Sequence, residues 1–273
     1  MYKIVRLFRI LFENLFIDYK NYDKNVLFDT NDTLMSFNIR SDHPKDNETN
    51  WVHRRDAILK MILEKKPAII CMQEVQPHMY KWLHKRLANV YNFVGVVGCK
   101  KFNYLQNSIR YLGNGLLIMY DKNKFGGCIE NIIWAGYAPE KFILKCKLFS
   151  NTTKYVIMNT HYSVDDIKHR QRLTELVNYD ISTEMSIDDE YIFYYCGDFN
   201  TTRNAFEIKN INLNHTIPVD DSKRTFNHFD DTHAVIDFIH SNIDIDSYAI
   251  VDDDYGVPYI SDHYPIEIPL KVL

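Results

Sequence analysis

Nine short apolar runs, each of strand length and rich in β-branched and aromatic residues, recur along the chain. Three segments between them, 50–66, 77–90 and 164–182, carry apolar residues at helical spacing. Some neighbouring runs are joined by short turns, so the pattern predicts mixed sheets covered by helices. The nine runs are 33–39, 68–75, 91–98, 115–121, 141–149, 154–162, 191–200, 234–241 and 264–270.

The 273 residues exceed the usual size of one domain, but layered α/β folds often reach this length as one unit. No linker, repeat or low-complexity tract divides the chain, and 46% apolar residues supply a large core. We therefore expect one domain over residues 31–273 and a monomer. The formal net charge of -4 provides no global basic field, so any phosphate binding must be local.

Residues 1–30 form an N-terminal extension in which Val5, Phe8, Phe12, Leu15 and Phe16 can share one helical face. We interpret it as an amphipathic helix that docks on the domain, with contact to a membrane surface or a partner as the alternative. Neither a signal peptide nor a membrane span is evident. The five cysteines are odd in number and widely spaced, which favours free thiols and a reducing, intracellular compartment such as the cytoplasm.

Polar residues repeatedly follow or interrupt the apolar runs. Ligand sites in open α/β sheets gather at the carboxyl ends of strands, so these groups are expected to converge. Read singly, each has an ordinary explanation, such as a turn at 197–200 or a core histidine. The residues are Asn38, Arg40, Gln73, Glu74, Asn159, His161, Asp198, Asn200, Asp237, Asp262 and His263.

The segment 197–200, GDFN, shows what such groups can do. Strand alternation places Asp198 and Asn200 on one face and Phe199 on the other. A carboxylate beside an amide suits a reaction in which water is deprotonated while a charged oxygen is held by a neutral donor. Glu74 is a hard oxygen ligand of the kind magnesium takes. Asp237, surrounded by apolar neighbours, needs a partner to offset its desolvation.

Taken in order, SFNIR, QEV, NTH, GDFN, IDFI and SDH resemble the motifs of the endonuclease/exonuclease/phosphatase superfamily, over about residues 33 to 270. The resemblance implies an α/β (α+β) fold, a four-layer sandwich of two packed mixed sheets flanked by helices. It also implies that Glu74 binds Mg²⁺, or alternatively Mn²⁺, with Asn38 and Asp262 on the metal side. Arg40 and Asn114 are second-tier phosphate contacts, although Arg40 could be a solvated strand end and Asn114 a turn residue.

The resemblance assigns the remaining roles position by position. His161 would contact the scissile phosphate, Asp198 would orient or deprotonate the attacking water, and Asn200 would hold a phosphate oxygen. Asp237 would pair with His263 and fix its orientation. That pair supplies the partner a buried Asp237 needs.

The function predicted from the sequence is a magnesium-dependent phosphohydrolase that cleaves a phosphodiester, with nucleic acid or a nucleotide-containing molecule as the favoured substrate. The alternative is a phosphatase or phospholipase acting on a lipid headgroup such as sphingomyelin or an inositide, with residues 1–30 as the membrane contact. A binding protein without catalysis is disfavoured because every motif acid and both histidines are present. Segment 98–111 mixes basic and aromatic residues, which suits phosphate binding and base stacking, or a solvated loop.

Overall fold

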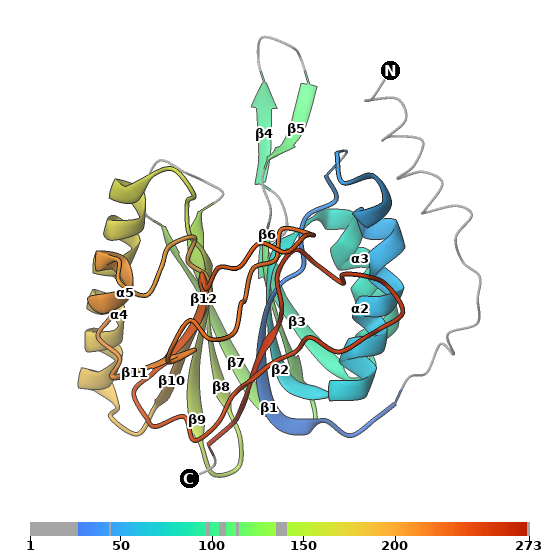
Figure 1. Cartoon of the computed structure of the whole chain (residues 1–273). Helices are drawn as coiled ribbons and strands as arrows, with labels where there is room; N and C mark the ends of the chain where they lie inside the picture. Colours follow the sequence, from blue (N-terminus) through green and yellow to red (C-terminus); the bar gives the residue numbers. More distant parts are fainter. Residues whose placement is uncertain are drawn as a thin grey trace.

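Two six-stranded sheets pack face to face, and helices cover their outer faces, in the computed structural model (Figure 1). The structure describes residues 27–43, 45–96, 99–103, 108–112, 115–134 and 141–271, with side chains left undescribed at 96–112 and 134. Most of the predicted N-terminal extension (residues 1–26) and Asn114 lie outside the described residues. No helix in the described ranges has an apolar stretch long enough to cross a membrane.

The first sheet has the strand order β13-β14-β1-β2-β6-β3. Its strands are β1 (Asn31–Asn38), β2 (Pro67–Val75), β3 (Tyr91–Val96), β6 (Gly115–Asp121), β13 (Ala249–Ile250) and β14 (Ile266–Pro269). Strands β1 and β2 run parallel, and their carboxyl ends therefore lie at the same edge of the sheet. Helices α2 (Trp51–Lys65) and α3 (Pro77–Leu87) cover the outer face, where their apolar residues pack on those of β1, β2 and β6.

The second sheet has the order β11-β12-β10-β9-β8-β7. Its strands are β7 (Gly127–Trp134), β8 (Phe142–Phe149), β9 (Lys154–His161), β10 (Ile192–Asp198), β11 (His215–Ile217) and β12 (Asp237–Ser241). Strands β9 and β10 are the parallel pair, linked by α4 (Ile167–Ile187), and α5 (Phe206–Lys209) follows β10. The short helix η1 (Asn47–Thr49) and the paired strands β4 (Cys99–Asn103) and β5 (Ser108–Leu112) complete the described elements.

This architecture confirms the predicted four-layer sandwich. Each of the nine apolar runs contains a strand, and the three helical segments contain α2, α3 and α4. The sequence pattern missed β7, β11, β13 and the β4–β5 pair. Asp237 lies in a strand as predicted, but it is the first residue of β12, so the strand starts later than the apolar run 234–241.

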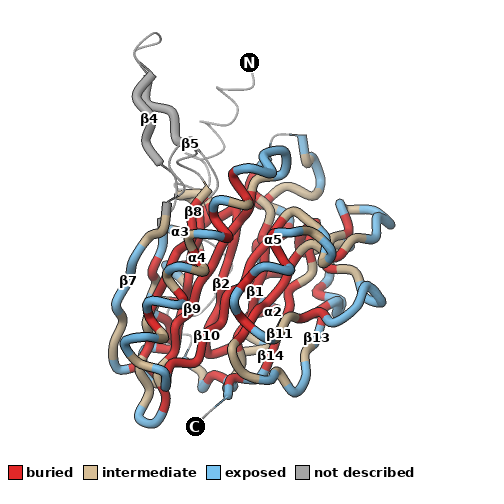
Figure 2. Tube along the Cα trace, turned by 90° about the vertical axis from the view of Figure 1, so that its left-hand side faces the viewer, coloured by how far each residue is buried: buried red, intermediate tan, exposed pale blue. Residues whose placement is uncertain are grey.

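The strands at the centre of the molecule are almost entirely buried, as the red tube in Figure 2 shows. Every residue of β2 is buried, because one face of the strand meets the helices and the other meets the second sheet. A polar bridge crosses this inter-sheet core: Gln73 Nε2 donates to Asn159 Oδ1 at 2.7 Å. Asn159 Nδ2 donates in turn to the carbonyls of Met72 (2.9 Å) and Leu117 (3.1 Å). The two sheets are therefore fixed relative to each other by directional bonds as well as by packing.

A buried histidine lies on β12, outside the polar strand ends. His240 is fully buried, with Nδ1 2.9 Å from Thr216 Oγ1 and its ring 5.1 Å from the Phe199 ring. Burial, assisted by the charge of Arg203, lowers the pKa of His240 to about 3. His240 therefore stays neutral in the folded protein at pH values where an unfolded chain would protonate it.

We expect acid to destabilise the fold through His240. The unfolded chain takes up this proton near pH 6.5 and the folded chain only near pH 3, so stability falls as the pH drops between these values. From pH 7 to pH 5 the loss is about 2 kcal/mol. The variant His240→Phe keeps an aromatic ring among its aromatic neighbours but has no proton to take up. Measured by urea unfolding, the drop in its free energy of unfolding from pH 7 to pH 5 should be smaller than that of the parent by this amount. An identical pH dependence in both proteins would contradict the assignment.

Candidate active site

Nine of the eleven polar residues singled out in the sequence meet at one edge of the sandwich, where β1, β2, β9 and β10 end, β12 begins and the segment before β14 lies. Gln73 and Asn159 do not join them, because they form the bridge inside the inter-sheet core. Asn38, the last residue of β1, is central. Its Nδ2 lies 3.0 Å from Asp198 Oδ2, 3.4 Å from Glu74 Oε1 and 3.4 Å from His263 Nε2. Asn38 and Glu74 belong to the first sheet and Asp198 to the second, so the site spans both sheets.

The backbone turns sharply where these strands end. Arg40, Glu74 and Asn200 all have left-handed backbone conformations, with φ of 55°, 64° and 48°. This region is sparsely populated by residues other than glycine, and such strain is tolerated where the surrounding contacts enforce it. The Arg40 N–H donates to Asn38 Oδ1 at 3.0 Å, and the Asn200 N–H donates to Asp198 Oδ1 at 2.9 Å.

Residues 197–200 therefore form both a turn and part of the site. Asp198 Oδ1 caps the turn, while Oδ2 lies 3.5 Å from His161 Nε2 and 3.7 Å from His263 Nε2. Phe199 is fully buried, as strand alternation predicted. The alternation does not extend to Asn200, because β10 ends at Asp198 and Asn200 Nδ2 donates to the Tyr162 carbonyl at 3.0 Å.

Gly197 is required by the close approach of β10 to β9. A Cβ at this position would lie 2.0 Å from the Thr160 carbonyl oxygen, and φ is +147°. Any side chain here would push apart the two strands that end in Asp198 and His161.

Glu74 provides a buried negative charge. Its Oε2 accepts the Ser41 N–H at 2.8 Å. Burial acts to raise the pKa of Glu74, but His161, the Ser41 amide and Arg40 outweigh it and bring the pKa to about 2. Glu74 is therefore ionised at neutral pH and has lone pairs available to a cation.

Asp262 and Arg40 lie beside Glu74. Arg40 Nη1 is 3.3 Å from Asp262 Oδ2, and its Nε is 3.0 Å from Asp46 Oδ2. Burial raises the pKa of Asp262, partly offset by the charges of His263 and Arg40. Arg40 is thus held by two carboxylates and is partly exposed, with 28% of its side chain accessible.

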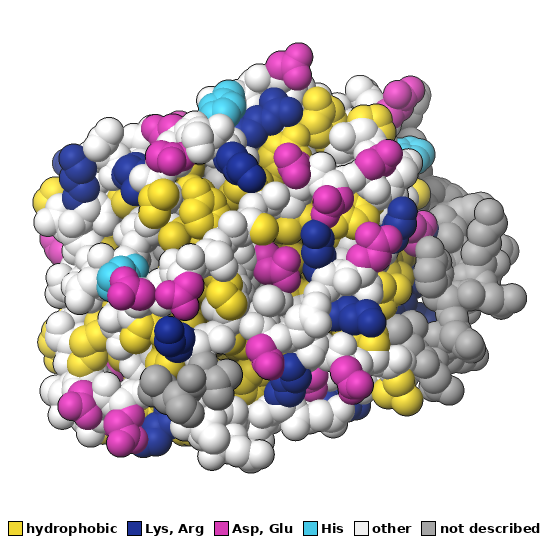
Figure 3. Space-filling model, turned by 60° about the horizontal axis from the view of Figure 1, so that its bottom comes forward, with side chains coloured by type: hydrophobic (Ala, Val, Ile, Leu, Met, Phe, Trp, Pro, Cys, Tyr) yellow, Lys and Arg dark blue, Asp and Glu magenta, His cyan; other side chains and the backbone are white. Residues whose placement is uncertain are grey.

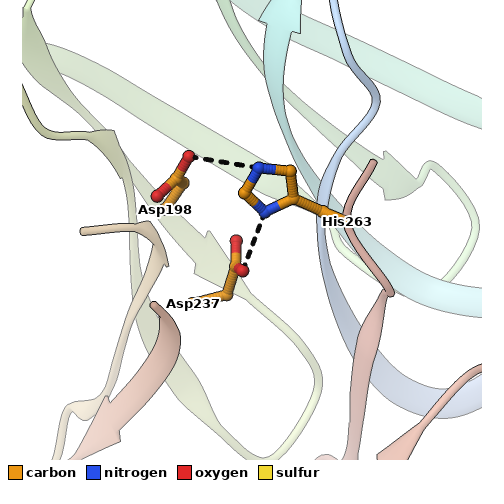
Figure 4. Close-up of side chains that lie close together, drawn as sticks. All are labelled: Asp198, Asp237 and His263. Atoms are coloured by element: carbon orange, nitrogen blue, oxygen red, sulfur yellow. Dashed lines mark hydrogen bonds and ion pairs between the residues drawn. The ribbon is translucent and has the colours of Figure 1, made fainter. Parts of the chain in front are cut away.

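His263 lies between two carboxylates, as Figure 4 shows. Its Nδ1 is 2.8 Å from Asp237 Oδ2, and its Nε2 faces Asp198. Asp198 and Asp237 are directly paired across β10 and β12, and a cation between them offsets the repulsion of two acids in this position. Burial opposes the charged ring, but Asp237 and Asp198 raise the pKa of His263 to about 10. His263 is therefore an imidazolium at neutral pH.

His161, in contrast to His263, is uncharged at neutral pH. Burial and the charge of Lys141 lower its pKa to about 4, although Asp198 acts in the other direction. A neutral imidazole can donate one N–H and accept one hydrogen bond. Lys141 Nζ donates to the Tyr162 carbonyl at 3.0 Å, the same oxygen that Asn200 uses. The site thus holds one charged and one neutral histidine, and the Nε2 atom of each faces Asp198 Oδ2.

The structure brings together every site residue predicted from sequence except Asn114, which lies outside the described residues. It also shows two supporting residues that the sequence did not single out. Ser261 Oγ donates to the Asn38 carbonyl at 2.7 Å. Thr225 Oγ1 accepts the N–H of Asp237 at 3.1 Å. Ser261 is part of the SDH motif and could have been found there, whereas Thr225 binds only backbone groups and leaves no comparable signal.

The fold and the site together define a protein of the layered α/β class with acids, amides and histidines gathered at one sheet edge. The sequence profile of the Endonuclease/Exonuclease/phosphatase family matches residues 35–263. The chain belongs to this family, whose members hydrolyse phosphoester bonds. No curated protein matches the chain significantly.

Solved structures share the fold. An endonuclease/exonuclease/phosphatase from Bacteroides vulgatus has a TM-score of 0.74 and 22% identity, covering 90% of this chain and 100% of its own. The mannosyl-6-phosphatase of Bacteroides thetaiotaomicron has a TM-score of 0.70 and 19% identity over 86% of this chain and 98% of its own. TDP2 from D. rerio, complexed with a single-strand DNA product, has a TM-score of 0.63 and 18% identity over 86% of this chain and 97% of its own. At these identities the similarity establishes the fold alone.

We predict that Asp237→Asn lowers the pKa of His263, because the variant loses the carboxylate that faces Nδ1. An opposite charge at this distance shifts a pKa by about one to three pH units, so the ring of His263 should titrate correspondingly lower. Following the histidine ring protons by NMR as a function of pH measures this directly. An unchanged titration would show that Asp237 is not the partner that keeps the ring charged.

Proposed function

We propose that the protein is a magnesium-dependent phosphohydrolase that cleaves a phosphodiester by in-line attack of an activated water, with nucleic acid or a nucleotide-containing molecule as substrate. The observation that carries the proposal is the Asn38 amide, which lies within 3.4 Å of Glu74 and 3.0 Å of Asp198. An ionised carboxylate suited to a metal and a carboxylate suited to a water are thus held side by side.

The residues present fit a magnesium ion at Glu74. Magnesium takes one or two carboxylates plus substrate phosphate oxygens and waters, and Glu74 is ionised with Asn38 and Asp262 near it. Asp198, Asp237 and His263 also cluster, with one ligand atom of each within 4.8 Å of the others. We place no metal there, because a charged His263 ring donates at both nitrogens and has no lone pair for a cation. A bound Mg²⁺ would neutralise charge on the phosphate oxygens.

The remaining groups offer donors to a phosphate and an acceptor to a water. His263 carries a positive charge at Nε2, and His161 and Asn200 offer neutral N–H groups on the side of β9. Asp198 Oδ1 is bound by the Asn200 N–H in the turn, whereas Oδ2 faces the cluster of Asn38, His161 and His263. Oδ2, which keeps a second lone pair beside the Asn38 bond, is therefore the acceptor for a proton from water. Burial raises the pKa of Asp198, which makes it a stronger base than an exposed aspartate.

The choice of a polyanionic substrate rests on local features. Strand β6 begins at Gly115, opposite Val75 at the end of β2. The β4–β5 pair, a separate two-stranded sheet, precedes β6 in the chain and therefore leads into it at the edge where Glu74 lies. Within this pair Lys101 is aligned with Arg110 and Lys100 with Tyr111. Away from that edge, the face in Figure 3 intersperses acidic and basic side chains, which offers a polyanion no continuous basic surface. The structurally similar proteins include both a TDP2 with a single-strand DNA product and a mannosyl-6-phosphatase, so the local features, and not the shared fold, carry the choice of substrate class.

The proposal predicts magnesium-dependent turnover of oligonucleotides or nucleotide diesters in a panel that also contains sugar monophosphates and phospholipid vesicles. Glu74→Gln should require a much higher magnesium concentration, because the amide removes the main anionic ligand while preserving the side-chain shape. The measurement is the rate of hydrolysis by both proteins as a function of Mg²⁺ concentration, with a chelator added as the metal-free control. Preferential hydrolysis of phospholipids or of monoesters would reject the substrate class, and an unaltered metal requirement in Glu74→Gln would remove Glu74 from the site.

Asp198→Asn separates the catalytic role of this residue from its role in the turn. Asparagine can still accept the Asn200 N–H, but its amide nitrogen cannot accept the bond from Asn38 Nδ2, so the thermal midpoint should fall modestly while the affinity for a substrate analogue stays close to that of the parent. Loss of a positioned general base should lower turnover by roughly 10² to 10⁴. Near-parental turnover would mean that the carboxylate serves the turn only.

A further inference from the structure

Arg54 is a buried cation close to the site that the proposed chemistry does not use. It lies in the first turn of α2 and is 1% exposed. Burial lowers its pKa to about 10, against the opposing charges of Asp262 and Asp46, so it remains charged at neutral pH. A desolvated guanidinium is costly unless each donor finds an acceptor.

The acceptors are carbonyl groups of three separate segments. Nη1 donates to the carbonyls of Ile39 (2.7 Å) and Ile260 (2.8 Å). Nη2 donates to the Arg40 carbonyl at 3.0 Å, and Nε donates to that of Thr49. The planar, multi-donor guanidinium can bind several diverging carbonyls at once, which a lysine cannot reproduce.

These carbonyls border the site on two sides. Ile39 and Arg40 directly follow Asn38, and Arg40 is one of the residues held in a left-handed conformation. Ile260 precedes the SDH segment, in which Ser261 binds the Asn38 carbonyl and His263 carries the charge. Arg54 therefore connects the end of β1 to residues 260–263, the two segments whose separation sets the distance from Asn38 to His263.

We propose that Arg54 is a positioning residue that holds segments 39–41 and 260–263 in the spacing the reaction needs. The expected effect on turnover rests on the proposed function. It does not touch the substrate. It acts by fixing the backbone that presents Asn38, the Ser41 N–H bound to Glu74, and His263. Its loss should therefore lower kcat more than it changes KM.

Arg55 provides a matched control on the same helix. It is also buried, but its guanidinium carbon lies 5.6 Å from the centre of the Trp82 ring, toward α3. Arg54→Lys and Arg55→Lys each shorten one buried cation, and both should lower the thermal midpoint. Arg54→Gln and Arg55→Gln form a second pair in case either lysine variant fails to fold.

Two measurements test the proposal, one of which is independent of activity. Hydrogen exchange should accelerate in peptides covering 39–41 and 260–263 in the Arg54 variant but not in the Arg55 variant. With magnesium and the best substrate of the panel, kcat should fall about 10- to 100-fold for the Arg54 variant with KM little changed, and stay near parental for the Arg55 variant.

The outcomes separate the two hypotheses. Equal exchange in the Arg54 and Arg55 variants would overturn the connection between the segments, whatever the enzyme hydrolyses. Faster exchange with parental kcat would overturn the positioning role. A parent protein that hydrolyses no phosphoester would instead refute the proposed function, and the exchange comparison would then decide by itself whether Arg54 holds the two segments.

Discussion

The site depends on the registration of the two sheets, because its acids, amides and histidines come from both. The buried bridge between Gln73 and Asn159 fixes this registration one and two residues before Glu74 and His161. Apolar packing is weakly directional and would tolerate small sliding of one sheet over the other, whereas amide hydrogen bonds in a dry core do not. The buried bond from Asn38 to Asp198 makes a second connection between the sheets, within the site itself.

The buried charges of the site are arranged so that each is compensated. Glu74 is stabilised by a backbone N–H and by Arg40, and the paired acids Asp198 and Asp237 share one imidazolium. Such compensation is needed because an unpaired charge at this depth would be neutralised by a pKa shift. The result is a set of groups with different protonation states within a few ångströms, which is what acid–base chemistry at neutral pH requires.

The sequence predicted the fold well because the central strands are buried on both faces and read as continuous apolar runs. Strand β7 escaped notice because it is an edge strand whose apolar run is broken by the exposed Glu130 and Asn131, and β11 and β13 are too short to show a period. Among the site residues, the acids and histidines at strand ends could be recognised from the sequence, because polar residues directly after apolar runs are unusual. Thr225 and Arg54 could not, because their partners are backbone atoms distant in sequence.

The left-handed residues at the strand ends have a consequence for how this chain can change. Arg40 and Glu74 occupy a backbone region where glycine or asparagine would relieve strain, so replacement could increase stability while removing the groups that the site uses. At these two positions, a replacement that stabilises the fold would therefore weaken the chemistry of the site. Laboratory evolution for heat resistance alone would be expected to erode the site there first, whereas selection for turnover would retain the strained residues and recover stability elsewhere.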